Sequence, residues 1–210
     1  FFATGVSIVI HPHNPWVPII HMNIRYFELS DGTYWFGGGI DLTPHYVYKE
    51  QAAFFHTQLK NTCDAFDPEF YTKYKQWADD YFYIKHRNET RGVGGIFFDR
   101  LNHQTLTLNK TQIFDFVCAV GRTFAPTYVH LMNINKNKPF SEEHKQWQHI
   151  RRGRYVEFNL VYDKGTKFGL DTNGRIESIL MSLPKTAQWF YDYKPEVNSE
   201  EQKTLDVLKK

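Results

Sequence analysis

The sequence predicts an α+β fold in which an antiparallel β-sheet is covered by helices. Short segments that alternate apolar and polar residues occur in adjacent pairs near both ends of the chain. Segments with helical periodicity follow one another between them, without the strand–helix–strand alternation that builds a parallel sheet. A chain of 210 residues is long enough to bury one large core. We therefore expect residues 1–210 to form a single domain.

Two strands are predicted near the start of the chain. The segment GVSIVIH at residues 5–11 alternates, so that Ser7 and His11 share one face and isoleucine and valine fill the other. Prolines then interrupt regular pairing, and IHMNIRYF at residues 20–27 forms a second strand. One face of this second strand is apolar, and the opposite face carries His21, Asn23 and Arg25.

A hairpin should follow the second strand. SDG at residues 30–32 is typical of a turn, and TYWF at residues 33–36 reads as the returning strand. The three glycines at 37–39 then predict a loop or a tight bend. Asp41 or Thr43 would start the next helix.

Helical periodicity predicts helices in the middle of the chain and at its end. Helices are expected over about 46–62, 67–84, 110–131, from Ser141 to about Arg152, and after residue 195. In the first of these, His56 lies on the apolar stripe. Between the second and third, KHRNETRGVGGIFFD passes through a glycine-rich turn into a short apolar strand.

The C-terminal part is predicted to be β-structure. RYVEFNLVY at residues 154–162 alternates, and FGLDTNGRIESILMSL at residues 168–183 contains Asn173-Gly174. Asn-Gly between apolar runs is the strongest short-range signal for a β-hairpin.

Composition excludes several classes of protein. Lys plus Arg is 25 and Asp plus Glu is 23, so the formal charge of +2 argues against nucleic-acid binding. Cys63 and Cys118 form neither a disulfide framework nor a zinc module, which favours a reducing compartment. No apolar run approaches the length that spans a bilayer. The 18 Phe, 13 Tyr and 5 Trp would suit a pocket for a flat ligand, although most aromatic residues fill cores.

The face carrying His21, Asn23 and Arg25 is the most informative feature of the sequence. Burying these groups unpaired against an apolar layer would be costly, so the face meets water, a ligand or a hydrogen-bond network. An arginine suits carboxylate or phosphate, and a neighbouring histidine suits proton transfer. A solvated strand face, a metal site and an acid–base site beside an anion-binding arginine all remain open.

Two further features could carry chemistry. His11, His21, His56 and His86 come from separate segments, and no HxxxH or HExxH spacing supports a metal site. Asp41 directly follows the glycine run, where a carboxylate could accept hydrogen bonds from ligand N–H groups or could cap a helix.

Several long segments together resemble the family of oxygen-dependent coproporphyrinogen oxidases. They are SIVIHPHNPWVPIIHMNIRYF, YWFGGGIDLTP, WADDYFYIKHRNETRGVGGIFFD and GRYVEFNLVYDKGTKFGLDTNGRIESILMSLP. The resemblance covers about residues 5–193, and the family's N-terminal region is expected to be missing from this chain. It implies a large antiparallel sheet flanked on both faces by helices. The absence of CxxxCxxC fits this family and not the radical enzyme that performs the same conversion anaerobically.

The resemblance also implies an activity and site residues. The expected reaction is oxidative decarboxylation of two propionates of coproporphyrinogen III to vinyl groups, which gives protoporphyrinogen IX. His21 corresponds to the proposed proton donor, Asp41 to the acid that binds pyrrole N–H groups, and Arg25 to a propionate anchor. The substrate-binding positions that match the family are Ser7, Asn23, Ile24, Arg25, Asn173, Gly174 and Arg175. The histidines assigned to a metal in some bacterial members correspond to His11, His21, His56 and His86.

The same resemblance sets expectations for cofactors, partners and location. It implies dioxygen as co-substrate and no organic cofactor, while a divalent metal stays possible. It implies a homodimer with an interface at about residues 155–190, and a location in the cytoplasm or, alternatively, in the mitochondrial intermembrane space. Two other classes remain open, namely a non-catalytic porphyrin or haem carrier and a histidine–metal hydrolase.

Overall fold

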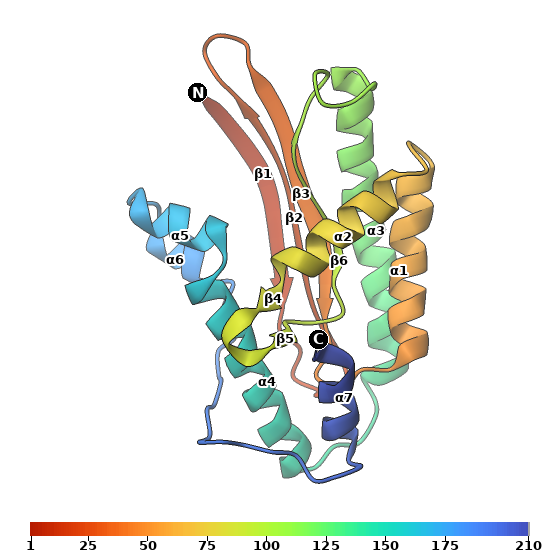
Figure 1. Cartoon of the computed structure of the whole chain (residues 1–210), viewed down its shortest axis with the longest axis vertical. Helices are drawn as coiled ribbons and strands as arrows, with labels where there is room; N and C mark the ends of the chain where they lie inside the picture. Colours follow the sequence, from red (N-terminus) through yellow and green to blue (C-terminus); the bar gives the residue numbers. More distant parts are fainter. Residues whose placement is uncertain (210) are drawn as a thin grey trace.

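The computed structural model describes residues 1–209, in which a four-stranded antiparallel sheet has helices on both sides (Figure 1). The strand order is β1-β2-β3-β6. The strands are β1 (Phe2–Ile10), β2 (Ile19–Glu28), β3 (Tyr34–Thr43) and β6 (Gly95–Leu101). The predicted α+β class, the strands at 5–11 and 20–27 and the turn at 30–32 are confirmed, with strand ends shifted by a few residues.

One face of the sheet forms the main hydrophobic core. Ile20 and Met22 of β2, Ile40 of β3 and Phe98 of β6 are buried in one cluster on this face. Period-two alternation puts these apolar residues on the same side of neighbouring strands. Three helices cover them: α1 (Lys49–Asp64), α2 (Phe70–Tyr81) and α3 (Lys110–Asn135). All three were predicted, with somewhat different ends.

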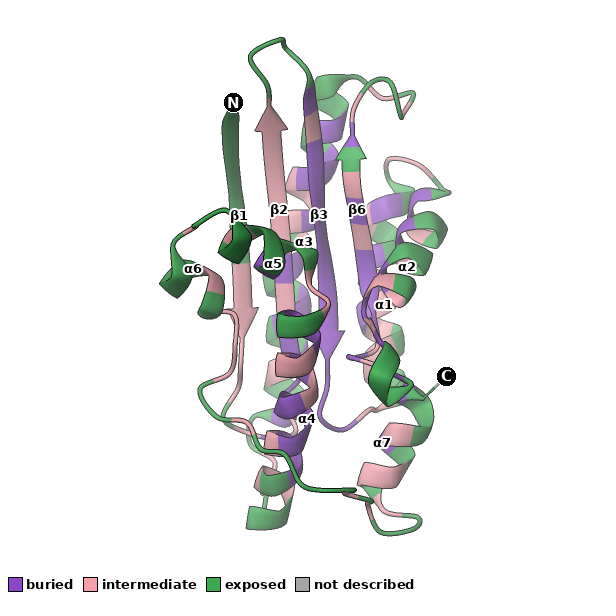
Figure 2. Ribbon diagram, turned by 60° about the vertical axis from the view of Figure 1, so that its left-hand side comes forward, coloured by how far each residue is buried: buried purple, intermediate pink, exposed green. Residues whose placement is uncertain are grey.

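Helices α4 to α6 lie on the opposite side of the sheet, as the two views in Figures 1 and 2 show. They are α4 (Glu142–Val161), α5 (Lys164–Asp171) and α6 (Ile176–Leu180). The rings of Tyr155 of α4 and His11 pack in a T-shaped arrangement, with centroids 5.0 Å apart. The remaining elements are the short strands β4 (Tyr83–Ile84) and β5 (Glu89–Thr90), the 3-10 turn η1 (Lys85–Arg87) and α7 (Glu200–Leu208).

The strands predicted at 154–162 and 168–183 are wrong, because both segments are helical. The helix that Ser141 caps continues past Arg152 to Val161. Its buried residues include Tyr155, Phe158 and Asn159, and this spacing belongs to one helix face rather than to one strand face. RYVEFNLVY satisfies both periods, and the helical one is selected because Phe158 is buried with Ala78, Phe82 and Ile84. Asn173 does take a positive φ of 54°, as a turn residue would, but this turn joins α5 to α6.

The glycine run is also not a loop, because Gly37, Gly38 and Gly39 lie inside β3. Asp41 and Thr43 are strand residues as well, and helix α1 starts only at Lys49. A Cβ atom on Gly39 would lie 2.4 Å from the backbone oxygen of Ile96 in β6. The strand therefore needs glycine there for close backbone approach, which is a use distinct from bending.

Within residues 1–209, none of the helices combines the length and the apolar character needed to cross a bilayer.

Candidate functional site

The predicted polar face of β2 exists, and neighbouring strands extend it. Ser7 of β1 pairs with Asn23, Asp41 of β3 pairs with His21, and Gly37 pairs with Arg25. Directly paired residues of antiparallel strands project to the same side. We call this surface the site face, and its residues are Ser7, His21, Asn23, Arg25, Gly37, Gly39 and Asp41. It faces away from the main core, toward the side on which α4 lies (Figure 2).

A buried carboxylate connects two side chains at one end of the site face. The Nδ1 atom of His21 lies 2.8 Å from Oδ1 of Asp41. The other carboxylate oxygen, Oδ2, accepts a hydrogen bond from the guanidinium of Arg91. The side chains of Asp41 and Arg91 are only 4% and 3% exposed. Arg91 lies on the segment that follows β5, so the site joins that segment to β2 and β3.

Arg91 holds this carboxylate in its charged form. Burial by itself would raise the pKa of Asp41, but the positive charge of Arg91 and the hydrogen bond from His21 outweigh it, and the pKa falls below its usual 3.8. Burial by itself would lower the pKa of Arg91. The charge of Asp41 outweighs this effect, and the pKa of Arg91 rises above its usual value. The two groups therefore form a buried pair of opposite charges.

The guanidinium of Arg91 is itself enclosed by aromatic rings and one amide. Its Cζ atom lies 4.3 Å from the ring centroid of Phe82, 4.5 Å from that of Tyr155 and 4.8 Å from that of Phe158. It also donates a hydrogen bond of 2.8 Å to Oδ1 of Asn159. Cation–π contacts of this kind favour a desolvated guanidinium. Helix α4 therefore supplies much of the environment that keeps Arg91 against Asp41.

His21 is the part of this arrangement that ligands can reach. Its side chain is 27% exposed, and its Nδ1 faces a carboxylate that can only accept hydrogen bonds. A neutral His21 therefore carries its proton on Nδ1 and leaves the lone pair of Nε2 free. Nε2 has no hydrogen-bond partner among residues 1–209. His21 can thus take up or deliver a proton at Nε2 while Asp41 fixes its orientation.

Arg25 lies farther along β2, over the glycines of β3. Its Nη1 donates to Oδ1 of Asn23 at 2.7 Å, and its Nη2 lies 3.0 Å from Oδ1 of Asp99 in β6. A Cβ atom on Gly37 would come within 2.8 Å of Nη2 and within 2.5 Å of Asp99 Oδ1. Glycine at this position therefore lets Arg25 reach across β3. Its side chain is 35% exposed, so donors remain available to a carboxylate.

The other predicted substrate-binding residues occupy different places. Ile24 lies on the opposite face of β2, where its side chain packs against the main core. Asn173, Gly174 and Arg175 form the turn between α5 and α6, on the same side of the sheet as the site face (Figure 1). No hydrogen bond or ion pair joins this turn to β2 or β3 within the described part of the chain.

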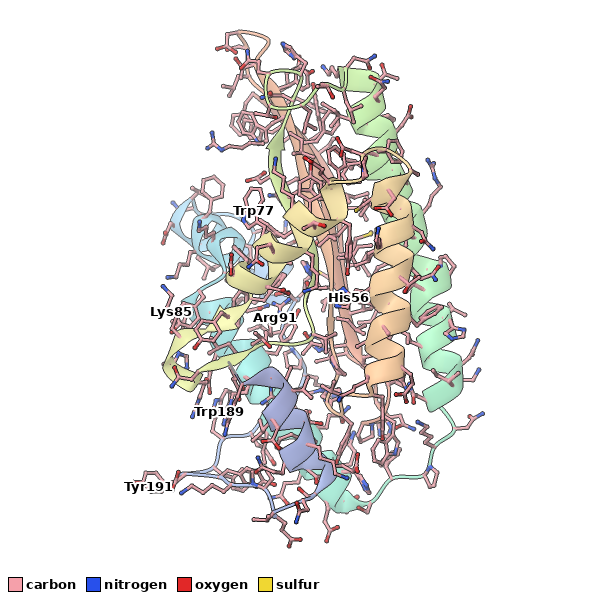
Figure 3. The ribbon with its side chains drawn as sticks, turned by 45° about the vertical axis from the view of Figure 1, so that its right-hand side comes forward. His56, Trp77, Lys85, Arg91, Trp189 and Tyr191 are labelled. Carbon is pink, nitrogen blue, oxygen red and sulfur yellow. The ribbon has the colours of Figure 1, made fainter. Side chains whose placement is uncertain are left out.

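The four histidines considered for a metal do not come together. His11 directs Nε2 to the backbone oxygen of Ser182 at 2.8 Å, and burial lowers its pKa to about 4, so it is neutral at physiological pH. His56 lies on α1, on the opposite side of the sheet (Figure 3). Its ring nitrogens lie 2.9 Å from the oxygen of Val93 and 3.0 Å from the hydroxyl of Tyr71.

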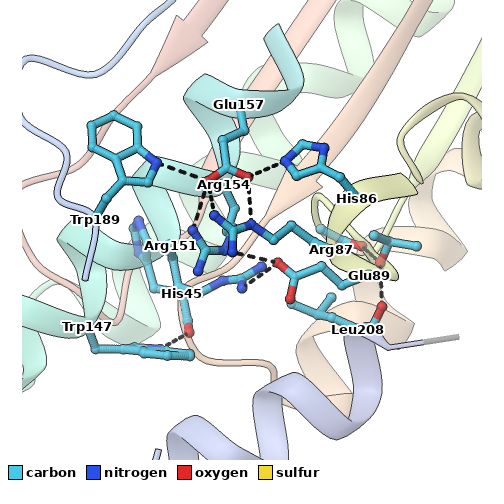
Figure 4. Close-up of polar contacts among 12 residues, drawn as sticks. His45, His86, Arg87, Glu89, Trp147, Arg151, Arg154, Glu157, Trp189 and Leu208 are labelled. Carbon is cyan, nitrogen blue, oxygen red and sulfur yellow. Dashed lines mark hydrogen bonds and ion pairs between the residues drawn. The ribbon is translucent and has the colours of Figure 1, made fainter. Parts of the chain in front are cut away.

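His86 belongs to a separate cluster around Glu157 (Figure 4). Its Nε2 lies 2.7 Å from Glu157, which also accepts hydrogen bonds from Arg87, Arg154 and Trp189. No group of three or more His, Cys, Asp or Glu residues within residues 1–209 is arranged to hold a metal ion. The four-histidine set therefore does not fit a common metal site.

Three residues that contact the site face directly or through Arg91 were not predicted from the sequence: Arg91, Asp99 and Asn159. Arg91 precedes the glycines of RGVGG, a segment predicted only as a glycine-rich turn before a strand. The available signal was Asp41 itself, because a carboxylate near an apolar strand needs a cation. Nothing in the sequence alone shows which of the many arginines supplies it.

Comparisons with known proteins point to one family. A family model described as coproporphyrinogen III oxidase matches residues 1–210. The chain is 54% identical over 99% of its length to the chloroplastic oxygen-dependent coproporphyrinogen-III oxidase of Hordeum vulgare, covering 54% of that protein. It is 53% identical over 100% of its length to the mitochondrial enzyme of Homo sapiens, covering 46%, and 48% identical to the enzyme of Francisella tularensis, covering 68%. The chain thus spans about half the length of most of these relatives.

Replacing Arg91 by Gln should destabilise the protein by about 3–5 kcal/mol, because Asp41 is left buried without its partner. In the wild type the depressed pKa of Asp41 stabilises the fold above pH 3.8, and this contribution is lost as the pH falls through the folded-state value. In Arg91→Gln burial dominates and raises that pKa, so the variant should recover stability relative to the wild type as the medium becomes acidic. Urea unfolding across a pH series measures both effects.

Arg122→Gln is the matched control, since it removes the same charge from an exposed position on α3 and should cost less than about 0.5 kcal/mol. The double variant Asp41→Asn/Arg91→Gln should lose less than the sum of the single losses. A loss below about 1 kcal/mol for Arg91→Gln, as for an exposed pair, would contradict the account.

Proposed function

The chain belongs to the coproporphyrinogen III oxidase family, and from this premise we propose that the full-length protein oxidatively decarboxylates propionate side chains of coproporphyrinogen III. The observation that carries the proposal is that the His21–Asp41 pair and Arg25 lie on one face of the sheet. A histidine oriented by an ionised carboxylate lies on the same strand face as an arginine that has donors to spare. The first can move a proton, and the second can bind a carboxylate.

The reaction requires dioxygen as the electron acceptor. Each propionate loses carbon dioxide, one hydrogen atom from its β-carbon as a proton, and two electrons, which leaves a vinyl group. Dioxygen takes up the two electrons and two protons to become hydrogen peroxide. One proton per cycle therefore comes from outside the substrate side chain. A proton donor on the site face would supply it.

We assign these tasks to residues of the site face. Arg25 binds the carboxylate of a propionate through charge-assisted hydrogen bonds, with Asn23 and Ser7 beside it. His21 exchanges a proton at Nε2. Asp41 orients His21 and, because each carboxylate oxygen can accept more than one hydrogen bond, can also receive a pyrrole N–H. Its low exposure favours the first role of Asp41 over the second.

Arg175 and the Asn173-Gly174 turn would complete the binding site from α5 and α6. Their support is the family resemblance together with their position on the same side of the sheet. A simple porphyrin or haem carrier explains the site less well, since binding alone requires neither the buried carboxylate nor its paired arginine. For location, we propose the cytoplasm, with the mitochondrial intermembrane space as the alternative; the compared relatives include chloroplastic and mitochondrial proteins.

We further propose that the protein is a homodimer with its contact at about residues 155–190. The support is an apolar surface formed by α5, α6 and the segment that follows them. Large side chains are exposed there, including Phe168 (70%), Met181 (69%) and Trp189 (52%). Exposed apolar surfaces of this kind mark protein contacts. The strands first expected for this contact are replaced by helices.

Aerobic incubation of the full-length protein with coproporphyrinogen III should yield protoporphyrinogen IX. Its formation is measured by the fluorescence of the porphyrin obtained after oxidation. An anaerobic reaction should yield none, because the electrons then have no acceptor. Asp41→Asn should lower kcat by at least about tenfold by loosening His21. Equal product formation without oxygen would contradict the proposal.

The double variant Phe168→Glu/Met181→Glu should convert the dimer to a monomer, because the two carboxylates would be buried in an apolar contact. Sedimentation equilibrium measures the mass. Val197→Glu serves as control, since Val197 is 85% exposed outside the segment and its variant should stay dimeric. A double variant that keeps the dimer mass would place the contact elsewhere.

A further inference from the structure

The pairing of β3 with β6 contains an irregularity beside Arg25. Gly38 pairs with Phe98, but Phe36 pairs with Leu101, so Asp99 and Arg100 together stand opposite the single residue Gly37. One extra residue in one strand is a β-bulge. The position of this bulge is at the end of the site face away from His21.

The bulge changes which side chains reach the site face. Phe98 and Leu101 are both buried in the main core although they are three residues apart, which strict alternation forbids. The two residues between them therefore both project away from that core. Asp99 reaches Arg25, and the guanidinium of Arg100 lies 5.6 Å from the ring centroid of Trp35.

Arg100 adopts an unfavourable backbone conformation to do this. Its φ of 54° falls in the left-handed region, which side chains other than Gly, Asn and Asp rarely enter. Such residues cluster at functional sites, where surrounding structure maintains them. Thr105 donates a hydrogen bond of 3.2 Å to the backbone oxygen of Arg100 and helps to hold this conformation.

The charge of Arg100 has no carboxylate partner within residues 1–209. The neighbouring Asp99 is already engaged by Arg25 at 3.0 Å. The side-chain contact of Arg100 is with the face of Trp35, which stacks on Phe27 with ring centroids 4.4 Å apart. Trp35 and Phe27 pair directly, two residues beyond Arg25 and Gly37. Two residues of a strand span about 7 Å, so Trp35, which the guanidinium of Arg100 contacts, lies about that far beyond Gly37 along β3.

We propose that Arg100 is a second carboxylate anchor, which binds a further propionate of the substrate while Trp35 and Phe27 contact the ring next to it. This inference rests on the proposed function, because a tetrapyrrole with several propionates presents carboxylates at separate points around one flat ring. Arg25 holds one of them, and Arg100 holds another toward the end of the site face. The bulge is what brings Arg100 to this position.

Steady-state kinetics with coproporphyrinogen III and equilibrium binding of coproporphyrin III, its fluorescent oxidised form, test the proposal on the full-length protein. Arg100→Asn keeps a residue that tolerates positive φ and removes the cation. It should raise KM and the Kd for coproporphyrin III about threefold, the size expected for one partly exposed charge pair, with kcat unchanged. The affinity of this variant should also depend less on salt.

Two controls separate anchoring from other effects. Arg100→Lys retains the charge and should stay near the wild-type KM, whereas Arg122→Gln removes the same charge from the opposite side of the sheet and should change nothing. A wild-type Kd and KM for Arg100→Asn, or an equal rise in Arg122→Gln, would overturn the proposal. A third outcome separates the two proposals. If Arg100→Asn binds coproporphyrin III more weakly but the wild type shows no turnover, Arg100 is a carboxylate anchor and the proposed activity is wrong.

Discussion

The buried pair formed by Asp41 and Arg91 is the interaction on which the candidate site depends. A carboxylate that is 4% exposed cannot stay ionised in a protein without a partner, and Arg91 supplies that partner from outside the sheet. Arg91 in turn requires Phe82, Tyr155, Phe158 and Asn159 around it. One ion pair thus ties β3 to α4 and fixes the orientation of His21.

The rest of the site face is shaped by the absence of side chains. Gly37 and Gly39 leave the backbone of β3 uncovered between Asp41 and Trp35, so that polar groups of β2 and β6 meet above it. His21 therefore stands at one end of the site face, and the cations Arg25 and Arg100 stand toward the other. A flat ligand with several carboxylates matches such a surface better than a compact one does.

The sequence predicted those parts of the site that depend on one strand. Alternation alone placed His21, Asn23 and Arg25 on a common face, and the apolar stripes gave α1, α2 and α3. Contacts between distant segments could not be read in this way. Asp41 lies opposite His21 because of strand register, and Arg91 reaches it through the packing of α4. The segment 154–162 was assigned to a strand because its apolar pattern suits both periods, and only burial of Tyr155, Phe158 and Asn159 on one side selects the helix.

The ionisation of Asp41 is the most direct test of this account. Carboxyl ¹³C NMR of the protein, with the Asp41 signal assigned through its loss in Asp41→Asn, would follow its titration. We expect this carboxyl to stay ionised below the usual pKa of 3.8, and Arg91→Gln to move its titration upward. A carboxyl that titrates above 3.8 in the wild type would contradict the account, because Arg91 would then not hold Asp41 in its charged form.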